Sequence, residues 1–283
     1  GIPEEVPAIT VNRICSSGLE AINLAAMMVI AGEVDIVVAG GTENMSMAPY
    51  LVRNVRWDGL HLGKSSLDDA VVETLSCPVN FYHMGVTAEN VAGAYGVSRE
   101  DQDAMALASH QRAVSAIEKG RFDSQIAHVS VAQQRGDPVV VGRDEGPRAD
   151  TDLEKLAALP SVFQDGGTVT AGNASTINDG AAAVLVMSEE KATSLGLTPR
   201  LVWVARAVAG VDPAMMGVGP VPAVRKVLDK TGMTIGDVDL VELNEAFAAQ
   251  ALYCVRELGL DMEKTNVNGG GISLGHPIGA TGA

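Results

Sequence analysis

Residues 8–41 read AITVNRICSSGLEAINLAAMMVIAGEVDIVVAGG, and this stretch decides the fold class. Residues 8–11 predict a short strand, and residues 19–31 form a long helix-forming run. Gly32 can end that helix, and residues 34–41 then predict a buried parallel strand that stops at a glycine pair. A strand, a helix and a parallel strand make a right-handed βαβ crossover. The sequence therefore predicts an α/β fold.

The composition of the chain argues against several classes of protein. The chain has 283 residues, of which 47% are apolar, enough for one large core or two closely packed ones. Apolar runs end well short of the roughly 20 residues of a membrane span. A net charge of −15 argues against general nucleic-acid binding, and three widely spaced cysteines argue against a disulfide framework. The first residues do not resemble a secretion signal. We expect neither a membrane nor a nucleic acid as partner.

The pattern changes along the chain. Residues 45–175 are rich in loops and amphipathic helices, the clearest of which spans 98–120 with Ser98 as its N-cap. Strand character returns at 181–187, and a mixed segment covers 201–209. Residues 222–231 and 245–258 then predict helices, and residues 240–243 predict a strand. We interpret this order as two βα halves separated by an insertion.

Cys15 lies where the first predicted strand passes into a helix. The amides and dipole of the helix can favour a thiolate there, and Ser16, Ser17 and Gly18 leave room for a substrate to approach. Backbone N–H groups at this turn could face an oxyanion. A buried core cysteine explains the position equally well, so Cys15 alone does not decide the chemistry.

Two further segments carry polar groups at turns. Asn244 and Glu245 stand where a predicted strand gives way to a helix, and Asn244 could either cap the helix or hold a water or carbonyl oxygen. His276 stands in NGGGISLGHPIGATG, residues 268–282. Packing alone does not explain so many glycines beside one imidazole.

These segments resemble the thiolase family, which includes acetyl-CoA acetyltransferases and 3-ketoacyl-CoA thiolases. Three signatures agree in order and spacing: NRICSSG at 12–18, NEAF at 244–247 and GHPIG at 275–279. The segments HMG at 83–85, TVTAGNAS at 168–175 and NDGAA at 178–182 also match the family. The resemblance covers essentially the whole chain.

The resemblance implies a layered αβαβα fold built from two similar βαβ halves with an inserted loop domain. Residues 1–44 and 177–198 would form the N-terminal half, which is incomplete at its start. Residues 45–176 would form the inserted loop domain with coenzyme A (CoA) and oligomer contacts, and residues 199–283 a truncated C-terminal half. Homodimers or homotetramers are expected, as is a cytoplasmic location, or a mitochondrial or peroxisomal one in a eukaryote.

The resemblance also implies catalytic roles. Cys15 would accept the acyl group of one CoA thioester, and His276 would activate Cys15. His276 and a water held by Asn244 would stabilise the thioester oxygen. The reaction would be thiolytic cleavage of a 3-ketoacyl-CoA, or Claisen condensation of two acetyl-CoA molecules. No permanently bound cofactor and no metal are expected.

Substrate-binding residues follow from the same resemblance. Ser175 would lie near the pantetheine arm and Arg148 near the nucleotide phosphates, although an exposed arginine is usually only a solvated charge. The acyl and pantetheine pocket would be lined by His83, Met84, Phe163 and Met216. Core packing is the alternative for Met84, Phe163 and Met216. Met84 resembles the residue of short-chain, acetoacetyl-type thiolases.

The chain departs from the family at both ends. Thiolases have a second catalytic cysteine in a Cys-x-Gly-Gly segment after the histidine motif, and this sequence ends at Ala283 before it. Cys77 and Cys254 lack the required glycine context. A section that precedes the nucleophile in the family is also missing. We therefore expect a fragment of a longer reading frame that is inactive alone.

Two other functions stay open. A β-ketoacyl synthase would share the fold and the nucleophilic cysteine, but it condenses by decarboxylation and uses two histidines; the NEAF segment favours a thiolase. A non-catalytic acyl-CoA-binding or lipid-binding protein could also keep the fold. The presence of both Cys15 and His276 argues against that reading.

Overall fold

A computed structural model describes residues 1–63 and 66–283, which divide into two units. The first unit comprises Gly1–Leu75, Ile177–Arg206 and His276–Ala283. The second comprises Ser76–Thr176 and Ala207–Gly275. The last eight residues, which include His276, thus belong to the same unit as Cys15.

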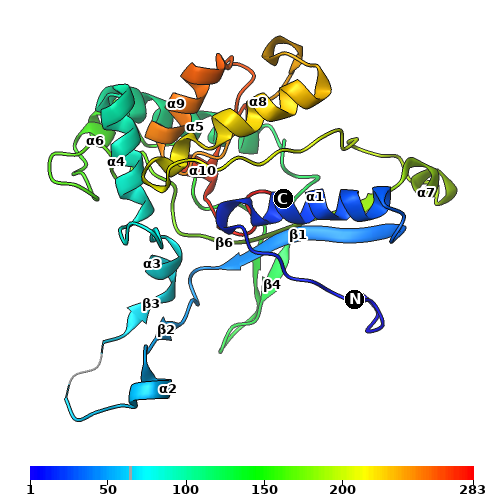
Figure 1. Cartoon of the computed structure of the whole chain (residues 1–283), viewed down its shortest axis with the longest axis horizontal. Coiled ribbons are helices and arrows are strands. Elements are labelled where there is room, and N and C mark those ends of the chain that lie inside the picture. Colours follow the sequence, from blue (N-terminus) through cyan, green and yellow to red (C-terminus); the bar gives the residue numbers. More distant parts are fainter. Residues whose placement is uncertain (64–65) are drawn as a thin grey trace. The chain divides into compact units, whose positions relative to one another are not determined.

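The first unit is built on one helix and a two-stranded ladder. Helix α1 (Ser17–Ile30) follows a short 3-10 turn, η1 (Ile14–Ser16), and lies along strand β1 (Ile36–Asn44) (Figure 1). Strand β1 pairs in antiparallel register with β6 (Asp179–Met187), from Ile36 opposite Met187 to Asn44 opposite Asp179. Gly32, with φ +73°, turns the chain from α1 toward β1, as the sequence predicts.

The predicted βαβ crossover is not formed. Residues 8–11 are not a strand and are largely exposed, and β1 runs antiparallel to its partner instead of parallel. A strand needs a neighbour to pair its N–H and C=O groups, and the described residues supply none for 8–11. Apolar periodicity predicts a strand but does not identify the strand that pairs with it, which explains why β1 was wrongly predicted to be parallel.

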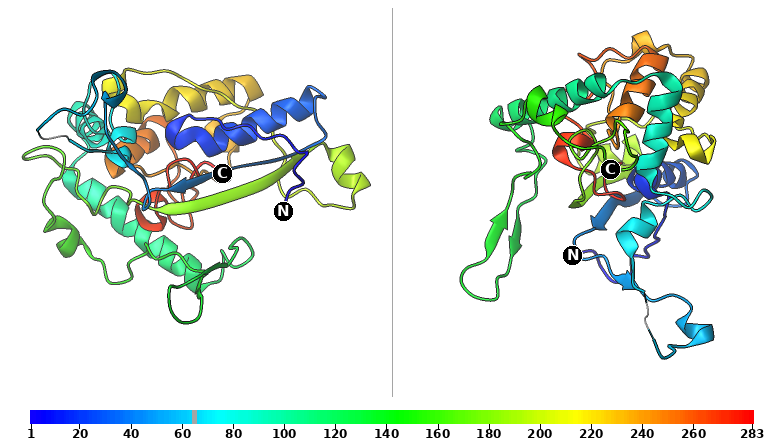
Figure 2. Two further views of the ribbon diagram at one scale, coloured as in Figure 1. Left: turned by 90° about the horizontal axis from the view of Figure 1, so that it is seen from below. Right: turned by 90° about the vertical axis from the view of Figure 1, so that its left-hand side faces the viewer.

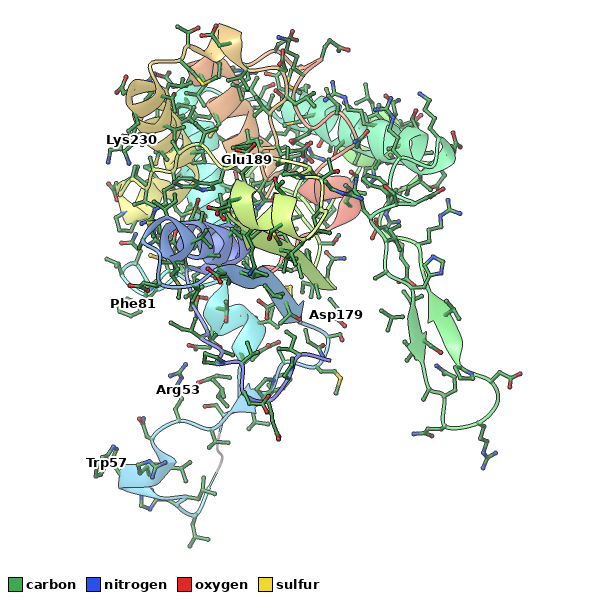
Figure 3. All side chains as sticks on the ribbon, turned by 90° about the vertical axis from the view of Figure 1, so that its right-hand side faces the viewer. Arg53, Trp57, Phe81, Asp179, Glu189 and Lys230 are labelled. Carbon is green, nitrogen blue, oxygen red and sulfur yellow. The ribbon has the colours of Figure 1, made fainter. Side chains whose placement is uncertain are left out.

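The first unit also contains a small hairpin and three short helices. Strands β2 (Tyr50–Leu51) and β3 (Asp68–Asp69) pair, and α3 (Ala70–Thr74) contacts β3. The other short helices are α2 (Val55–Asp58) and, farther along the chain, α7 (Glu189–Ser194). Arg53 and Trp57 lie on the segment around α2 (Figure 3). Arg53 bridges Asp68, at 2.9 Å, and Glu73.

The second unit is mainly helical. Its elements are α4 (Met84–Tyr95), α5 (Arg99–Glu118), α6 (Leu153–Ala157), η2 (Pro213–Val218), α8 (Pro220–Thr231), η3 (Ile235–Asp237), α9 (Ala248–Leu258), α10 (Gly271–Leu274) and the hairpin of β4 (Val129–Val131) with β5 (Val139–Val141). Helix α5 begins as predicted, because the Ser98 hydroxyl accepts the N–H of Asp101 at 3.1 Å. The hairpin extends away from the helices (Figure 2).

Small side chains form the core of the second unit. One apolar cluster gathers residues of α4, of the 169–174 segment and of the start of α9, and a second joins α5, α6, α9 and α10. Alanines such as Ala106, Ala248 and Ala251 are fully buried, so α5 and α9 can approach closely. Small core side chains suit a chain in which 4% of the residues are aromatic.

One predicted strand of the C-terminal half, residues 240–243, is absent. Residues 201–209 form neither a helix nor a strand in the described structure, and residues 240–243 make one bridge, in which Val241 lies parallel to Thr265. The predicted helices are present as α8 and α9. A second βαβ ladder is therefore not complete within the described residues. No helix in the described ranges has the length and apolar character needed to cross a membrane.

Candidate active site

The turn that carries Cys15 is held by its own side chains. Asn12 Oδ1 accepts the N–H of Ile14 at 2.9 Å, while the Ser17 hydroxyl accepts the N–H of Arg13 at 2.8 Å and donates to the Ile14 carbonyl at 2.7 Å. Ile14 has φ +48°, which a β-branched residue rarely adopts. Backbone strain of this kind persists only where surrounding contacts enforce it, so the turn before Cys15 is tightly constrained.

The loop that carries His276 packs on this turn through glycines. A Cβ atom added at Gly18 would lie 2.8 Å from the Ala283 nitrogen, and one added at Gly282 would lie 2.6 Å from the Leu19 nitrogen. A Cβ atom at Gly41 would lie 2.0 Å from the Gly279 carbonyl oxygen. Backbone therefore touches backbone at the first turn of α1 and on β1. Close backbone packing thus accounts for Gly282 and for the contact of Gly279 with Gly41, although packing was not expected to explain the glycines beside His276.

His276 is buried and neutral. Its backbone N–H donates to Asn178 Oδ1 at 3.0 Å, and its Nδ1 lies 2.6 Å from the Thr281 hydroxyl, which donates to the Pro277 carbonyl. Because the Thr281 hydroxyl can donate to the Pro277 carbonyl, we assign the imidazole proton to Nδ1, facing Thr281, and the lone pair to Nε2. Burial lowers the pKa of His276 to about 4, so the imidazole can act as a base at neutral pH.

Cys15 is a protonated thiol in this arrangement. Burial raises its pKa above the ordinary value, a backbone hydrogen bond at Cys15 acts in the opposite direction, and the negative charge of Glu43 raises the pKa further. Burial therefore opposes the thiolate that the start of a helix can favour. A base must remove the proton before the sulfur can attack.

Glu43 connects the two segments. It stands near the end of β1, its charge acts on Cys15, and its Oε2 accepts the N–H of Gly279 at 3.0 Å. Glu43, Thr281 and the side chain of Asn178 were not predicted as site residues. The available signals were the polar residues directly after the glycine pair and the matching NDGAA segment.

Asn244 lies in the second unit and does not cap a helix. Helix α9 begins at Ala248 with Phe247 as its N-cap, so the capping alternative is wrong. The Asn244 carbonyl accepts Gln250 Nε2 at 3.2 Å, and Gly271 packs directly on the Asn244 side chain. Ser175 lies near Asn244 in the same unit, because the Ser175 N–H donates to the carbonyl of Ala246 at 3.0 Å.

Some of the predicted pocket residues lie together in the second unit. The rings of His83 and Phe163 stack with centroids 4.7 Å apart, and Phe163 meets Phe247 edge to face at 6.0 Å. Met84 packs against the same apolar cluster. Met216 lies half-buried on η2, which contacts α4 and α9.

Arg148 is exposed on the segment before α6. Its backbone N–H donates to Nδ1 of His110 at 3.2 Å, so α5 holds the chain at this point. Burial and the positive charge of Arg148 lower the pKa of His110. The lowered pKa keeps His110 neutral, as the role of Nδ1 as acceptor requires.

A constrained cysteine turn beside a loop with a buried neutral histidine defines the class of nucleophilic cysteine enzymes. Family models agree with this class: residues 1–190 match "Thiolase, N-terminal domain" and residues 197–283 match "Thiolase, C-terminal domain". The chain belongs to the thiolase family.

Individual relatives support the assignment over the whole chain. An acetyl-CoA acetyltransferase of Pseudomonas aeruginosa is 54% identical over 284 residues, as is a probable acetyl-CoA acyltransferase of Staphylococcus aureus. Both alignments cover 100% of this chain and 72% of the relative. This coverage agrees with the expectation that family members extend beyond the chain.

Solved structures confirm the fold. The chain superposes on the Bacillus anthracis acetyl-CoA acetyltransferase with TM-score 0.96 and 50% identity, covering 99% of this chain and 71% of that one. For human mitochondrial 3-ketoacyl-CoA thiolase in complex with CoA, the TM-score is 0.94 with 45% identity, and the match covers 100% of this chain and 70% of that one. The predicted thiolase-type fold and acyltransferase class are thereby confirmed, and the two alternative functions find no support.

Proposed function

We propose that this chain transfers acyl groups between CoA thioesters through an acyl-cysteine intermediate on Cys15. The reaction is thiolytic cleavage of a 3-ketoacyl-CoA, or the reverse condensation of two acetyl-CoA molecules to acetoacetyl-CoA. The single observation that carries the proposal is the packing of the His276 loop on the Cys15 turn through Gly18, Gly41 and Gly282. The names of the relatives and the solved thiolase–CoA complex support the substrate class.

The first half-reaction forms the acyl-enzyme. Nε2 of His276 takes the Cys15 proton, and the thiolate attacks the thioester carbonyl to give a tetrahedral oxyanion. The oxyanion collapses with release of the CoA thiolate, which recovers a proton from the imidazolium. Backbone N–H groups at the start of α1 are the donors that we assign to the oxyanion.

The second half-reaction regenerates the thiol. Cleavage begins differently: the Cys15 thiolate attacks the 3-keto carbon of the 3-ketoacyl-CoA, the bond between the α- and β-carbons breaks, and acetyl-CoA leaves after its enolate takes up a proton. A CoA thiol then attacks the acyl-cysteine, gives its proton to the released Cys15 thiolate by way of His276, and carries the acyl group away. In condensation, the enolate of acetyl-CoA attacks the same carbonyl, and we assign its stabilisation to His276 and a water held by Asn244. Neither remaining cysteine suits the removal of the α-proton. Cys254 is fully buried with a pKa raised to about 12 by burial, and Cys77 is also buried.

The proposed substrate contacts lie in the second unit. Ser175 contacts the pantetheine arm, and the exposed guanidinium of Arg148 suits a phosphate. Support for an acyl pocket comes from the stacked His83–Phe163 pair and the neighbouring Met84. Met216 completes this set, and Met84 supports a short-chain substrate such as acetoacetyl-CoA.

We further propose a cytoplasmic homodimer or homotetramer that acts in fatty acid metabolism. The bacterial relatives support the location, and the exposed valines of the β4–β5 hairpin support self-association. Residues 45–176, which include this hairpin, are assigned to the inserted loop domain with CoA and oligomer contacts.

Acetylation of Cys15 tests the proposed function. The full-length protein is mixed with acetyl-CoA, quenched in acid and analysed by intact-mass and peptide mass spectrometry. We expect one acetyl group on the peptide that contains Cys15, and none in the Cys15→Ser variant. An acetyl group on Cys77 or Cys254 instead, or no acetylation, would refute the assignment of the nucleophile.

A further inference from the structure

Glu245 is a buried carboxylate that directly follows Asn244 and joins three segments of the second unit. It is 2% exposed. Its Oε2 accepts the Ser109 hydroxyl at 2.7 Å and the N–H of Ile272 at 3.3 Å, and its Oε1 accepts Asn266 Nδ2 at 2.9 Å. These donors are neutral and come from α5, the 266 turn and α10. A buried carboxylate is costly unless its oxygens are hydrogen-bonded, so all three donors matter.

The glycine turn at 269–271 lies directly on this carboxylate. A Cβ atom at Gly270 would meet the Glu245 carboxyl carbon at 2.4 Å, and one at Gly271 would meet Asn244 Oδ1 at 2.7 Å. The turn therefore packs on both Asn244 and Glu245. It leads into α10, which ends two residues before His276.

Two more polar side chains complete the cluster. Asn266 is buried with φ +48°, and its amide exchanges two hydrogen bonds with the backbone of Leu243, at 2.8 and 2.7 Å. The hydroxyls of Ser109 and Ser273 lie 2.8 Å apart. The cluster thus ties the backbone on both sides of Asn244 to α5 and α10. Such fully hydrogen-bonded networks fix one arrangement of the segments that they join.

We infer that Glu245 is a positioning residue for acyl transfer: its carboxylate fixes the backbone that presents Asn244 and the α10 segment that leads to His276. The inference rests on the proposed function. Glu245 itself touches no substrate in this account. Its loss should lower turnover through misplacement of the oxyanion-stabilising groups, with little change in substrate affinity.

Glu245→Gln is the sharpest test, because glutamine keeps the shape and replaces one acceptor by an N–H donor. In either orientation of the glutamine amide, its N–H group faces another donor, which is Asn266 Nδ2 in one orientation and the Ile272 N–H in the other. Asn266 cannot flip to offer its oxygen instead, because both of its amide atoms are hydrogen-bonded to Leu243. In the full-length enzyme we expect kcat for acetoacetyl-CoA cleavage to fall about 100-fold, with KM within about twofold of wild type. Glu245→Asp should recover part of kcat.

Val91→Ala is the matched control, because Val91 is fully buried on α4 in the same unit and has no polar role. It should lower Tm and leave kcat unchanged. Ser109→Ala removes one hydrogen-bond donor to Glu245, so this variant should fold and show a smaller fall in kcat with unchanged KM. It replaces Glu245→Gln as the test if Glu245→Gln does not fold. A Glu245→Gln enzyme that loses Tm but keeps wild-type kcat overturns the inference. Lack of turnover in the wild-type enzyme would instead overturn the proposed function.

Discussion

At the scale of single residues, Cys15 is a protonated thiol and His276 is a neutral imidazole. Burial raises the pKa of the Cys15 thiol and lowers that of His276 to about 4, so both groups are neutral at rest. Moving the proton from Cys15 to His276 creates two charges in a desolvated place, which is unfavourable without compensation. In the proposed mechanism the thiolate attacks the bound thioester at once, so we expect the reactivity of Cys15 to depend on substrate binding.

The charge of Glu43 should tune Cys15 measurably. A carboxylate near a thiol favours the neutral form and raises the thiol pKa, so Glu43→Gln should shift the midpoint of the alkylation profile to lower pH. The measurement is the rate of Cys15 alkylation by iodoacetamide as a function of pH. Glutamine can still accept the Gly279 N–H, so the loop contact is preserved. An unchanged or higher midpoint would disprove the electrostatic role of Glu43.

The residues found from sequence are those with a local signature. Cys15 and His276 stand in recognisable motifs, so both were predicted. Glu43 has no such signature, because its importance comes from a contact with Gly279 that spans 236 positions of sequence. The ionisation state of Cys15 was also beyond the sequence, since it depends on burial that only the folded chain creates.

At the scale of elements, glycines set how closely the His276 loop lies on α1 and β1. Gly40 and Gly180 show the same closeness on the β1–β6 ladder, where an added Cβ would meet the Ala182 carbonyl and the Pro277 ring. These contacts are with backbone or a rigid ring, so neighbours have little freedom to move aside. The elements can therefore hold one arrangement of the loop.

Gly41→Ala should destabilise the protein and slow acylation of Cys15. Its Cβ would lie 2.0 Å from the Gly279 carbonyl oxygen, and overpacking of this kind costs about 1–3 kcal/mol or more. Gly93→Ala is the control: Gly93 lies inside α4 with open space around it, so alanine should stabilise the helix by about 0.5–1 kcal/mol. Urea unfolding and single-turnover acetylation measure both effects. Equal stability of Gly41→Ala and wild type would contradict the packing argument.

Helices were easier to predict than strands. The Ser98 cap and the 3.6-residue pattern are local, and α1, α5, α8 and α9 appear close to their predicted ranges. Strands depend on partners elsewhere in the chain, so residues 8–11 and 240–243 were overpredicted. The pairing of β1 with β6 joins segments that flank the long insertion, and the direction of that pairing could not be read from either strand.

At the scale of the whole molecule, the fold was predicted from ordered motifs that span the chain. Five or more short segments in the right order specify a family far better than the composition does, and the family models and solved structures confirm that result. The proposed division into residues 1–44 with 177–198, 45–176 and 199–283 follows from the same resemblance. Cys15 and His276, far apart in sequence, belong to one unit of the structure.

The central claim is that His276 removes the proton of Cys15, and single-turnover acetylation of Cys15 by acetyl-CoA at pH 7 tests it most directly. His276→Asn keeps a polar group near Thr281 and removes the Nε2 base. Loss of a general base typically costs 10²–10⁴-fold, so we expect acetylation to slow by about that factor while Cys15→Ser shows none. Acetylation of His276→Asn at the wild-type rate would contradict the account.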